Sequence, residues 1–291
     1  MPPERPRAAR KRFGQHFLEQ PWVDKVLLAI EPQASDTFIE IGPGRGALTR
    51  PLTAAVERVV AFEIDRDLAS ELRVHAPPNL AIVEGDFLDL TADRVRNALT
   101  HGGGAPARVR VAGNLPYNVA SPILFKLIAL YRDGIPLVDA TVMLQREVAD
   151  RLAASPGSRE YGALSVLVRH SADVKRLLSL PPGAFRPAPN VRSAVVRLQF
   201  HPDEPPARDQ VAFEKLTQAI FTRRRKTLAN ALPAYPPSSG VRVAEILGRA
   251  ALDGRRRPET LAISDLVRLA DAFADAGSGR SGTSDGSVRA V

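Results

Sequence analysis

The chain contains no cysteine and only five histidines among its 291 residues. The absence of cysteine excludes disulfide bonds, thiolate metal sites and a cysteine nucleophile. The histidines are scattered without the spacing of metal ligands, so we expect no structural metal. No apolar run approaches the roughly 20 residues that a membrane-spanning helix needs. The basic, proline-rich start leads into no apolar stretch of a secretory signal, and we therefore expect a cytoplasmic protein without membrane association.

The positive charge is unevenly distributed along the chain, whose formal net charge is +8. Residues 1–12 hold five basic residues and one acidic residue, and we expect them to form a disordered basic tail. Residues 208–275 carry twelve basic and eight acidic residues, with the basic ones concentrated at 223–226 and 255–257. Such clusters suit a polyanionic partner. A solvated helix face is the alternative, and the charge runs alone do not decide between the two.

Short β-rich segments alternate with helical ones from Thr37 onward, which predicts a parallel sheet covered by helices on both faces. The expected strands are Thr37–Ile41, Arg58–Glu63, Leu80–Gly85, Val109–Gly113, Asp139–Leu144, Ser165–His170 and Ala194–Phe200. Seven strands suggest a doubly wound α/β sheet closed by an antiparallel edge. Between the fourth and fifth strands, Ser121 followed by Pro122 resembles an N-cap with proline at the first helical position.

The composition changes after Phe200, where a segment rich in proline and charge is followed by no strand-like run. We place the domain boundary there, with a catalytic domain at 13–202 and a small all-α domain at 208–275. Three sets of apolar residues at helical spacing support the second domain. They are Phe213, Leu216 and Ile220; Val243, Ile246 and Leu247; and Leu266, Leu269, Ala270 and Phe273. Ser264 is the expected cap of the last helix, and residues 276–291, rich in glycine and serine, are expected to be disordered.

A glycine turn follows the first expected strand, with Gly42 and Gly44 close behind Glu40. Glycine lets a ligand approach the backbone closely, because it has no Cβ and tolerates positive φ. This spacing also satisfies the dinucleotide-binding pattern, so the turn alone does not separate a dehydrogenase from other enzymes. Glu40 separates them, because a carboxylate beside the turn repels a pyrophosphate and favours the ammonium group of S-adenosylmethionine.

Acidic residues also end the second and third expected strands. Glu63 is placed where a carboxylate accepts both hydroxyl protons of a ribose. Asp86 is placed to accept from an adenine amine, and Phe87 beside it to cover the ring. Because ligands of open α/β sheets bind at the carboxyl ends of the strands, we expect these acidic residues to converge there with Glu40.

The fourth expected strand ends in Asn114, Leu115, Pro116 and Tyr117. An exocyclic amine of adenine is a poor nucleophile, because its lone pair is delocalised into the ring. Asn114 Oδ1 and the Leu115 carbonyl are suited to accept its hydrogens and bend it toward tetrahedral geometry. Pro116 stiffens the loop, and Tyr117 offers a flat face on which a flipped-out base stacks. A plain strand followed by a tight turn explains any one of these residues but not the four together.

At this point the sequence resembles the ribosomal RNA adenine dimethyltransferases, and within them the bacterial small-subunit group. The matching segments are 13–18 (FGQHFL), 40–46, Glu63, 85–86, 114–117 (NLPY), 145–148 (QREV), 161–162, 181–187 (PPGAFRP), 191–194 (VRSA) and 223–227. The resemblance implies a class I, Rossmann-like methyltransferase fold with S-adenosylmethionine as the cofactor. It also implies a monomer that dimethylates two adjacent adenosines in a hairpin loop near the 3′ end of small-subunit (16S) rRNA, within a pre-30S particle, and that acts late in subunit assembly.

The resemblance also implies roles for individual residues. His16, as a backbone contact, and Leu18 would line the cofactor pocket with Gly42, Glu63, Asp86 and Asn114, and Phe185 would close on the target base opposite Tyr117. The candidate RNA-binding residues are Arg223, Arg224, Arg225 and Lys226, which we place on one helix.

Two other functions remain open at this stage. The sister group that methylates large-subunit rRNA has a related glycine turn and Asn-Pro-aromatic loop, although Leu115 and the long helical carboxyl segment favour the small-subunit group. A non-catalytic RNA-binding assembly factor on the same scaffold is the other alternative. Asn114, Tyr117, Gly44 and Glu63 disfavour it, because a binding module needs no amine-bending loop.

Overall fold

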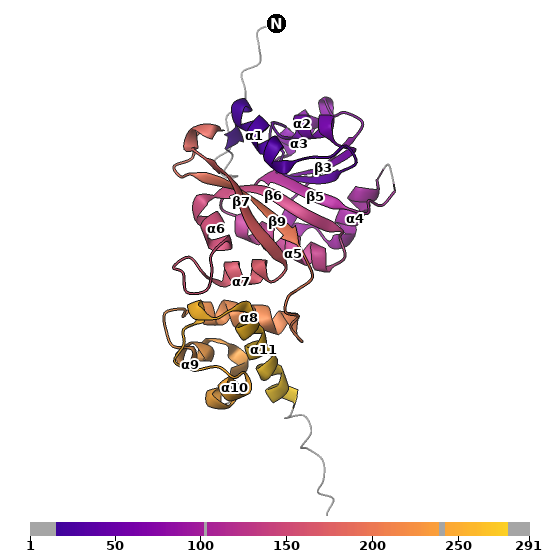
Figure 1. Cartoon of the computed structure of the whole chain (residues 1–291). Helices are drawn as coiled ribbons and strands as arrows, with labels where there is room; N and C mark the ends of the chain where they lie inside the picture. Colours follow the sequence, from indigo (N-terminus) through magenta and orange to yellow (C-terminus); the bar gives the residue numbers. More distant parts are fainter. Residues whose placement is uncertain (1–15, 102–103, 239–241, 279–291) are drawn as a thin grey trace, which may run out of the picture. The chain divides into compact units, whose positions relative to one another are not determined.

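The computed structural model of the chain describes residues 16–101, 104–238 and 242–278. The chain divides into two compact units, each of which we describe separately (Figure 1). The first consists of Met1–Ala153 and Ala172–His201, and the second of Ala154–Ser171 and Pro202–Val291. Residues 154–171, which we expected in the catalytic domain, belong to the second unit together with the residues after His201.

The first unit is built on a seven-stranded sheet with the order β4-β3-β2-β5-β6-β9-β7. Its strands are β2 (Thr37–Ile41), β3 (Arg58–Glu63), β4 (Leu80–Glu84), β5 (Val109–Asn114), β6 (Leu137–Gln145), β7 (Ala172–Leu180) and β9 (Ser193–Phe200). The strands β2 to β6 run parallel, and β9 lies antiparallel between β6 and β7. The mostly parallel α/β sheet with an antiparallel edge is thus confirmed.

Helices cover both faces of this sheet. On one face lie α1 (Gln20–Ile30), α2 (Thr49–Ala55) and α3 (Arg66–Val74), and on the other α4 (Ala92–Thr100), α5 (Ala120–Arg132) and α6 (Arg146–Leu152) (Figure 1). Buried residues of α1 and α2, including Val23, Val26 and Leu52, form one core with residues of the central strands. This burial excludes water from the sheet and gives the strand ends a fixed position.

The strand order brings the expected site residues together. The strand β2 pairs with β3 on one side and with β5 on the other, so that Ile41 lies opposite both Phe62 and Gly113. A Cβ at Gly113 would lie 2.6 Å from the carbonyl oxygen of Ile41, so only glycine permits this approach. The ends of three adjacent parallel strands therefore meet at one edge of the sheet.

A second, two-stranded sheet joins distant parts of the first unit. The strand β1 (Phe17–Leu18) pairs antiparallel with β8 (Phe185–Arg186), and the Glu19 backbone N–H donates to the carbonyl of Ala184. This pairing holds the segment before α1 beside the end of β7.

The second unit is all-helical apart from its connections. Its α-helices are α7 (Ala163–Arg169), α8 (Gln210–Phe221), α9 (Leu228–Ala231), α10 (Val243–Arg249) and α11 (Ile263–Ser278). The described residues of the two units also form short 3₁₀ segments at Phe87–Asp89, Pro182–Ala184, Leu232–Ala234, Pro236–Ser238 and Pro258–Thr260. The expected apolar faces of α8 and α11 are buried, as are Ile246 and Leu247 of α10. The Tyr161 hydroxyl donates to the carbonyl of Leu261, which ties the 154–171 segment to this unit.

Three local expectations were wrong. Residues 165–170, expected as a strand, belong mostly to α7, and the strand follows at β7. A short buried apolar run fits either state, and here Ser165 Oγ accepts from the Gly162 N–H and stabilises the first helical turn. Helix α5 begins at Ala120, so Ser121 is not its cap, and α11 begins before Ser264, with Asp265 accepting from the Ala262 N–H instead.

Most residues of the two expected tails lie outside the described part of the chain. Residues 1–12 and 279–291 fall outside the described residues, whereas 276–278 continue α11. Within the described part of the chain, no helix has both the length and the apolar character to cross a bilayer.

Candidate active site

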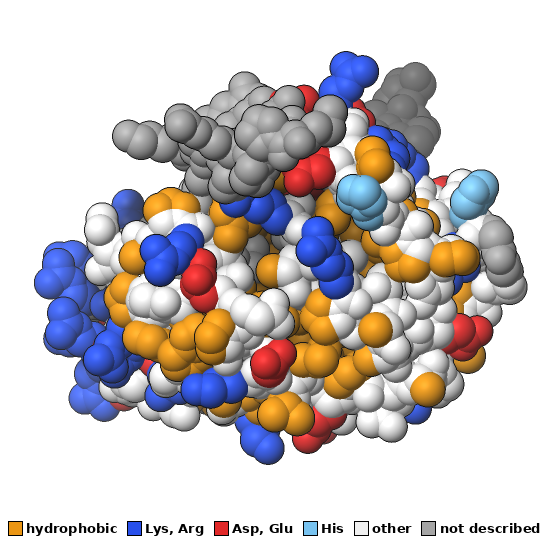
Figure 2. Space-filling model, turned by 90° about the horizontal axis from the view of Figure 1, so that it is seen from above, with side chains coloured by type: hydrophobic (Ala, Val, Ile, Leu, Met, Phe, Trp, Pro, Cys, Tyr) orange, Lys and Arg blue, Asp and Glu red, His pale blue; other side chains and the backbone are white. Residues whose placement is uncertain are grey.

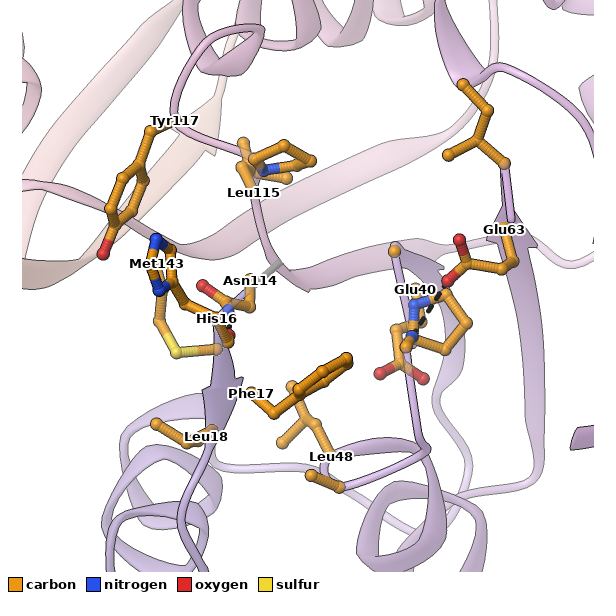
Figure 3. Close-up of a pocket in the computed structure, with 16 residues that line it drawn as sticks. His16, Phe17, Leu18, Glu40, Leu48, Glu63, Asn114, Leu115, Tyr117 and Met143 are labelled. Atoms are coloured by element: carbon orange, nitrogen blue, oxygen red, sulfur yellow. Dashed lines mark hydrogen bonds between the residues drawn. The ribbon is translucent and has the colours of Figure 1, made fainter. Parts of the chain in front are cut away.

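A pocket lies at the carboxyl edge of the sheet in the first unit (Figure 3). Its lining includes most of the expected cofactor and catalytic residues: His16, Leu18, Glu40, Gly42, Gly44, Glu63, Asn114, Leu115, Pro116 and Tyr117. The remaining lining is largely apolar: Phe17, Pro43, Ala47, Leu48, Ile64 and Met143.

The glycine turn forms one wall of the pocket. Gly44 has a φ of +59°, and a Cβ at this position would lie 3.1 Å from the ring of Phe17. The Arg45 guanidinium lies over that ring, 4.5 Å from its centroid. The turn therefore needs glycine both for its left-handed backbone and for the close approach of Phe17.

Glu63 is held against this turn by backbone hydrogen bonds. Its Oε2 accepts from the Gly44 N–H at 2.9 Å, and its Oε1 accepts from the Asp65 N–H at 2.9 Å. Burial raises the pKa of Glu63 above its ordinary value, while these two bonds oppose that rise. Each carboxylate oxygen keeps a further lone pair with which it could accept from a ligand.

Glu40 lines the pocket and is almost completely buried. It is 2% exposed, and its Oε2 has no hydrogen-bond partner among the described residues. Burial raises the pKa of Glu40 to about 8; the Thr49 side chain opposes this rise, and the nearby Glu63 carboxylate adds to it. A buried carboxylate with an unsatisfied oxygen is costly, and a cationic ligand group would remove that cost.

The side-chain amide of Asn114 is held by one hydrogen bond. Its Nδ2 donates to the carbonyl of His16 at 2.6 Å, so the amide nitrogen is engaged. The amide oxygen Oδ1 is then the side-chain atom that could accept from a substrate amine. His16 contributes its carbonyl to this contact, and its Nδ1 hydrogen bonds with the carbonyl of Pro187 at 2.7 Å.

The residues that follow Asn114 form a rigid loop. Leu115 is buried, and its N–H donates to the carbonyl of Met143. The hydroxyl of Tyr117 hydrogen bonds with Ser193 Oγ at 2.7 Å, and its ring stacks with that of His16. The aromatic ring therefore lies at the rim of the pocket in a defined orientation.

Two expected site residues lie away from this pocket. Asp86 does not line it, because its Oδ1 accepts from the Leu88 N–H and begins a short 3₁₀ turn. Phe87 is buried with its ring edge against Phe62, so it does not cover a ligand ring as expected. The second oxygen of Asp86 remains the part of that side chain that a ligand could use.

Phe185 also differs from expectation. Its side chain is 1% exposed and belongs to the core formed with α1 and α2, where Leu18 is its partner in the β1–β8 pair. It does not line the pocket opposite Tyr117. The physical reason is that the Phe185 ring packs among the apolar side chains of this core, where it is removed from water.

The pattern of residues did not reveal the apolar floor of the pocket. Phe17, Leu48 and Met143 were missed, since apolar residues at such positions are ordinary core residues in the sequence. The register offers one signal, because Met143 of β6 lies opposite Asn114 of β5. A residue opposite a known site residue in a parallel pair shares the same strand edge.

The four basic residues of the second unit do not lie on a helix as expected. Helix α8 ends at Phe221, and 222–225 form turns. Arg224 is directed toward the protein, where its Nη1 donates to the carbonyl of Arg159 at 2.8 Å and its Nε lies 3.9 Å from Glu259. Arg223, Arg225 and Lys226 are exposed. A shallow cleft is lined by Gly157, Ser158, Arg159, Arg224, Arg225, Arg257 and Glu259.

A model of the ribosomal RNA adenine dimethylase family matches residues 7–268 of the chain. The ribosomal RNA small subunit methyltransferase A of Nitrosococcus oceani is 44% identical over 265 residues, covering 90% of this chain and 94% of that protein. The protein of the same name from Acinetobacter baylyi is 39% identical over 274 residues, covering 93% and 94%.

Two solved structures are similar over most of the chain. A dimethyladenosine transferase from Plasmodium falciparum has a TM-score of 0.72 at 24% identity, covering 90% of this chain and 98% of that one. The 23S rRNA methyltransferase ErmE has a TM-score of 0.61 at 22% identity, covering 89% and 99%. These two likenesses show a shared fold.

Proposed function

The chain belongs to the ribosomal RNA adenine dimethylase family, and from this membership we propose that it modifies two adjacent adenosines in a hairpin loop near the 3′ end of small-subunit (16S) rRNA. It is an S-adenosylmethionine-dependent rRNA adenine dimethyltransferase. The observation that carries the proposal is the convergence of Glu40, Glu63 and Asn114 at one pocket, with Tyr117 at its rim. Two methyl groups on each exocyclic amine complete the proposed reaction.

The residues of the pocket fit the cofactor. The buried Oε2 of Glu40, which has no partner among the described residues, suits the ammonium group of the methionine part, and Glu63 suits the ribose hydroxyls. The left-handed turn at Gly44 allows close approach of the ligand to the backbone. The bound cofactor supplies a methyl group on a positively charged sulfonium.

Asn114 and the Leu115 carbonyl act on the target amine. Because Nδ2 is committed to His16, Oδ1 accepts a hydrogen from the amine and withdraws the lone pair from conjugation with the ring. Such acceptors stabilise the charge that develops on nitrogen, and their rigid placement contributes most of the rate. The amine becomes acidic once it is alkylated, so water is sufficient to take its proton and no general base is required.

The small-subunit substrate is favoured over the large-subunit alternative by the two relatives with the name small subunit methyltransferase A. Methyl transfer to pre-30S particles and, in a separate reaction, to 23S rRNA, both from a strain without this gene, tests the choice. Tritiated methyl is expected in two adjacent adenosines of 16S rRNA, mapped by mass spectrometry of nuclease fragments. Label in 23S rRNA instead would support the large-subunit alternative, and no label in either RNA would support a non-catalytic assembly factor.

We place the RNA contacts of the second unit at the exposed Arg223, Arg225 and Lys226 and assign Arg224 a supporting role. The cleft beside them collects guanidinium groups from Arg159 and Arg257 as well, and this concentration of charge suits phosphate. Seen from above the view of Figure 1, further Lys and Arg side chains gather at one side of the molecule, and the acidic side chains are scattered (Figure 2). The proposed partner is the pre-30S particle, and we propose a cytoplasmic monomer.

The salt dependence of binding tests this placement. Each phosphate contact that is lost reduces the slope of log affinity against log salt concentration by about 0.7 to 0.9. Arg223→Gln combined with Arg225→Gln is expected to reduce the slope by nearly twice this amount, because two contacts are lost. Cofactor affinity is expected to stay unchanged. Arg208→Gln is the matched control, because Arg208 is an exposed arginine that pairs with Asp275. An unaltered slope, or an equal change in the control, would contradict the assignment.

A further inference from the structure

The ring of Tyr117 is held at two places. Its hydroxyl hydrogen bonds with Ser193 Oγ at 2.7 Å. The imidazole of His16 lies against the ring, with centroids 5.3 Å apart and planes inclined by 27° (Figure 3). A ring fixed at its hydroxyl and supported on one face has little freedom to tilt or to slide.

Ser193 is itself immobile. It is the first residue of β9, where it pairs with Gln145 of β6 and with Leu180 of β7. It is also 1% exposed. Because strands bind it on both sides, the position of its hydroxyl is set by the sheet, and its hydrogen bond transfers that position to Tyr117.

Packing alone does not explain a serine at this place. The following residues of β9, from Ala194 to Val196, are buried and apolar. A buried hydroxyl costs free energy unless it is hydrogen-bonded, so an alanine would fill the strand with less penalty. The partner of this hydroxyl is the phenol of Tyr117, and the use of a serine is explained by that contact.

We propose that Ser193 is a positioning residue for the target base. By binding the hydroxyl of Tyr117, it fixes the depth and tilt of the ring on which the base stacks. His16 supports one face of the ring, and the base takes the opposite face. This inference rests on the proposed function, in which Tyr117 stacks on the target adenine.

The hydrogen bond can be removed from either side. Ser193→Ala deletes one hydroxyl and Tyr117→Phe deletes the other, and the stacking ring remains in both variants. With unmethylated pre-30S particles, each variant is expected to lower kcat/KM about fivefold to tenfold, as loss of one hydrogen bond does. The double variant is expected to be no worse than either single variant, because all three lack the same bond. Cofactor affinity, measured by calorimetry, is expected to stay unchanged.

Base stacking has its own readout and control. A hairpin RNA with 2-aminopurine at the target position is expected to show a smaller fluorescence change on binding to Ser193→Ala and Tyr117→Phe than to the unaltered protein. Thr141→Val is the control, because Thr141 is a buried residue of β6 whose hydroxyl accepts from Arg197. It is expected to lose thermal stability and to keep both kcat/KM and the fluorescence change.

Several outcomes would overturn the inference. One is that Ser193→Ala resembles Thr141→Val, with a lower Tm and kcat/KM within twofold of the original. Another is that the losses multiply in the double variant, since the two hydroxyls would then act independently. If Ser193→Ala fails to fold, Tyr117→Phe alone decides through kcat/KM and fluorescence. Tyr117→Ala separates a failure of the proposed function from a failure of this inference. If it also leaves kcat/KM unchanged, the stacking role of Tyr117 is wrong. If it lowers kcat/KM strongly, only the positioning role of Ser193 is wrong.

Discussion

Replacing Glu40 with glutamine removes a titrating group from the pocket and nearly preserves its shape. Since burial raises the pKa of Glu40 to about 8, roughly nine-tenths of this carboxyl holds a proton at pH 7. An ammonium group beside the carboxyl favours the charged form, so binding of the cofactor is expected to release up to about 0.9 proton at pH 7. Cofactor affinity should then rise by nearly tenfold per pH unit between about pH 6 and 7.5.

The stability of the ligand-free protein should change with pH in the opposite sense. The pKa of Glu40 is raised on folding from its ordinary value of 4.5, so the folded chain binds more protons than the unfolded chain between pH 4.5 and 8. The contribution of this group to stability is therefore fully present below pH 4.5 and is lost as pH rises to 8. Relative to Glu40→Gln, the free energy of unfolding should fall by up to about 1.4 kcal/mol per pH unit in that window.

Two assays check these expectations. Calorimetry with S-adenosylhomocysteine, in buffers of different ionisation enthalpy, counts the protons released; pH values below 7.5 keep the ligand's own amine charged. Thermal unfolding without ligand at several pH values gives the stability difference. If Glu40→Gln shows the same proton release and the same pH slope of affinity as the original protein, Glu40 does not bind the ammonium group and the reasoning from its burial is refuted.

The remaining predictions concern three other side chains. Glu63→Ala is expected to weaken cofactor binding by about 1 to 3 kcal/mol, because charged hydrogen bonds to the ribose are lost, and unchanged calorimetric affinity would exclude that contact. Asn114→Ala is expected to lower the single-turnover rate by about 100-fold or more with cofactor affinity retained, and a near-normal rate would reduce Asn114 to a turn residue. Phe185→Ala is expected to lower the free energy of unfolding by about 3 to 5 kcal/mol, because a buried aromatic ring is removed from the core. If this variant keeps a normal Tm but has impaired turnover, Phe185 contacts the target adenine as the resemblance implied.

The sheet was largely predictable, because a strand that is buried on both faces has a dense β-branched and apolar sequence. The expected segments at Thr37–Ile41 and Arg58–Glu63 agree with β2 and β3. The strand predicted at residues 165–170 was wrong. A short buried apolar run is compatible with a helix or a strand, and contacts with distant residues decide between them. Residues 154–171 belong to the second unit and not to the catalytic one because of similar long-range contacts, such as that of Tyr161 with Leu261.

The polar part of the site was predictable because strand ends of a parallel sheet share one edge. Glu40, Glu63 and Asn114 lie on β2 and its two neighbours, and all three line the pocket. Asp86 follows the outermost strand β4, one strand further from the pocket. The direction of a side chain was not predictable where tertiary contacts set it, as for Phe185 in the core and Arg224 against the carbonyl of Arg159.

The pairing of β1 with β8 has a consequence for biosynthesis. Residues Phe17 and Leu18 leave the ribosome early, but the strand that holds them, Phe185–Arg186, follows more than 160 residues later. Until that later segment emerges, the wall of the pocket formed by His16 and Phe17 lacks its partner strand. A nascent chain that already contains the glycine turn therefore cannot yet enclose a ligand, and the enzyme becomes competent only when synthesis of its catalytic unit is nearly complete.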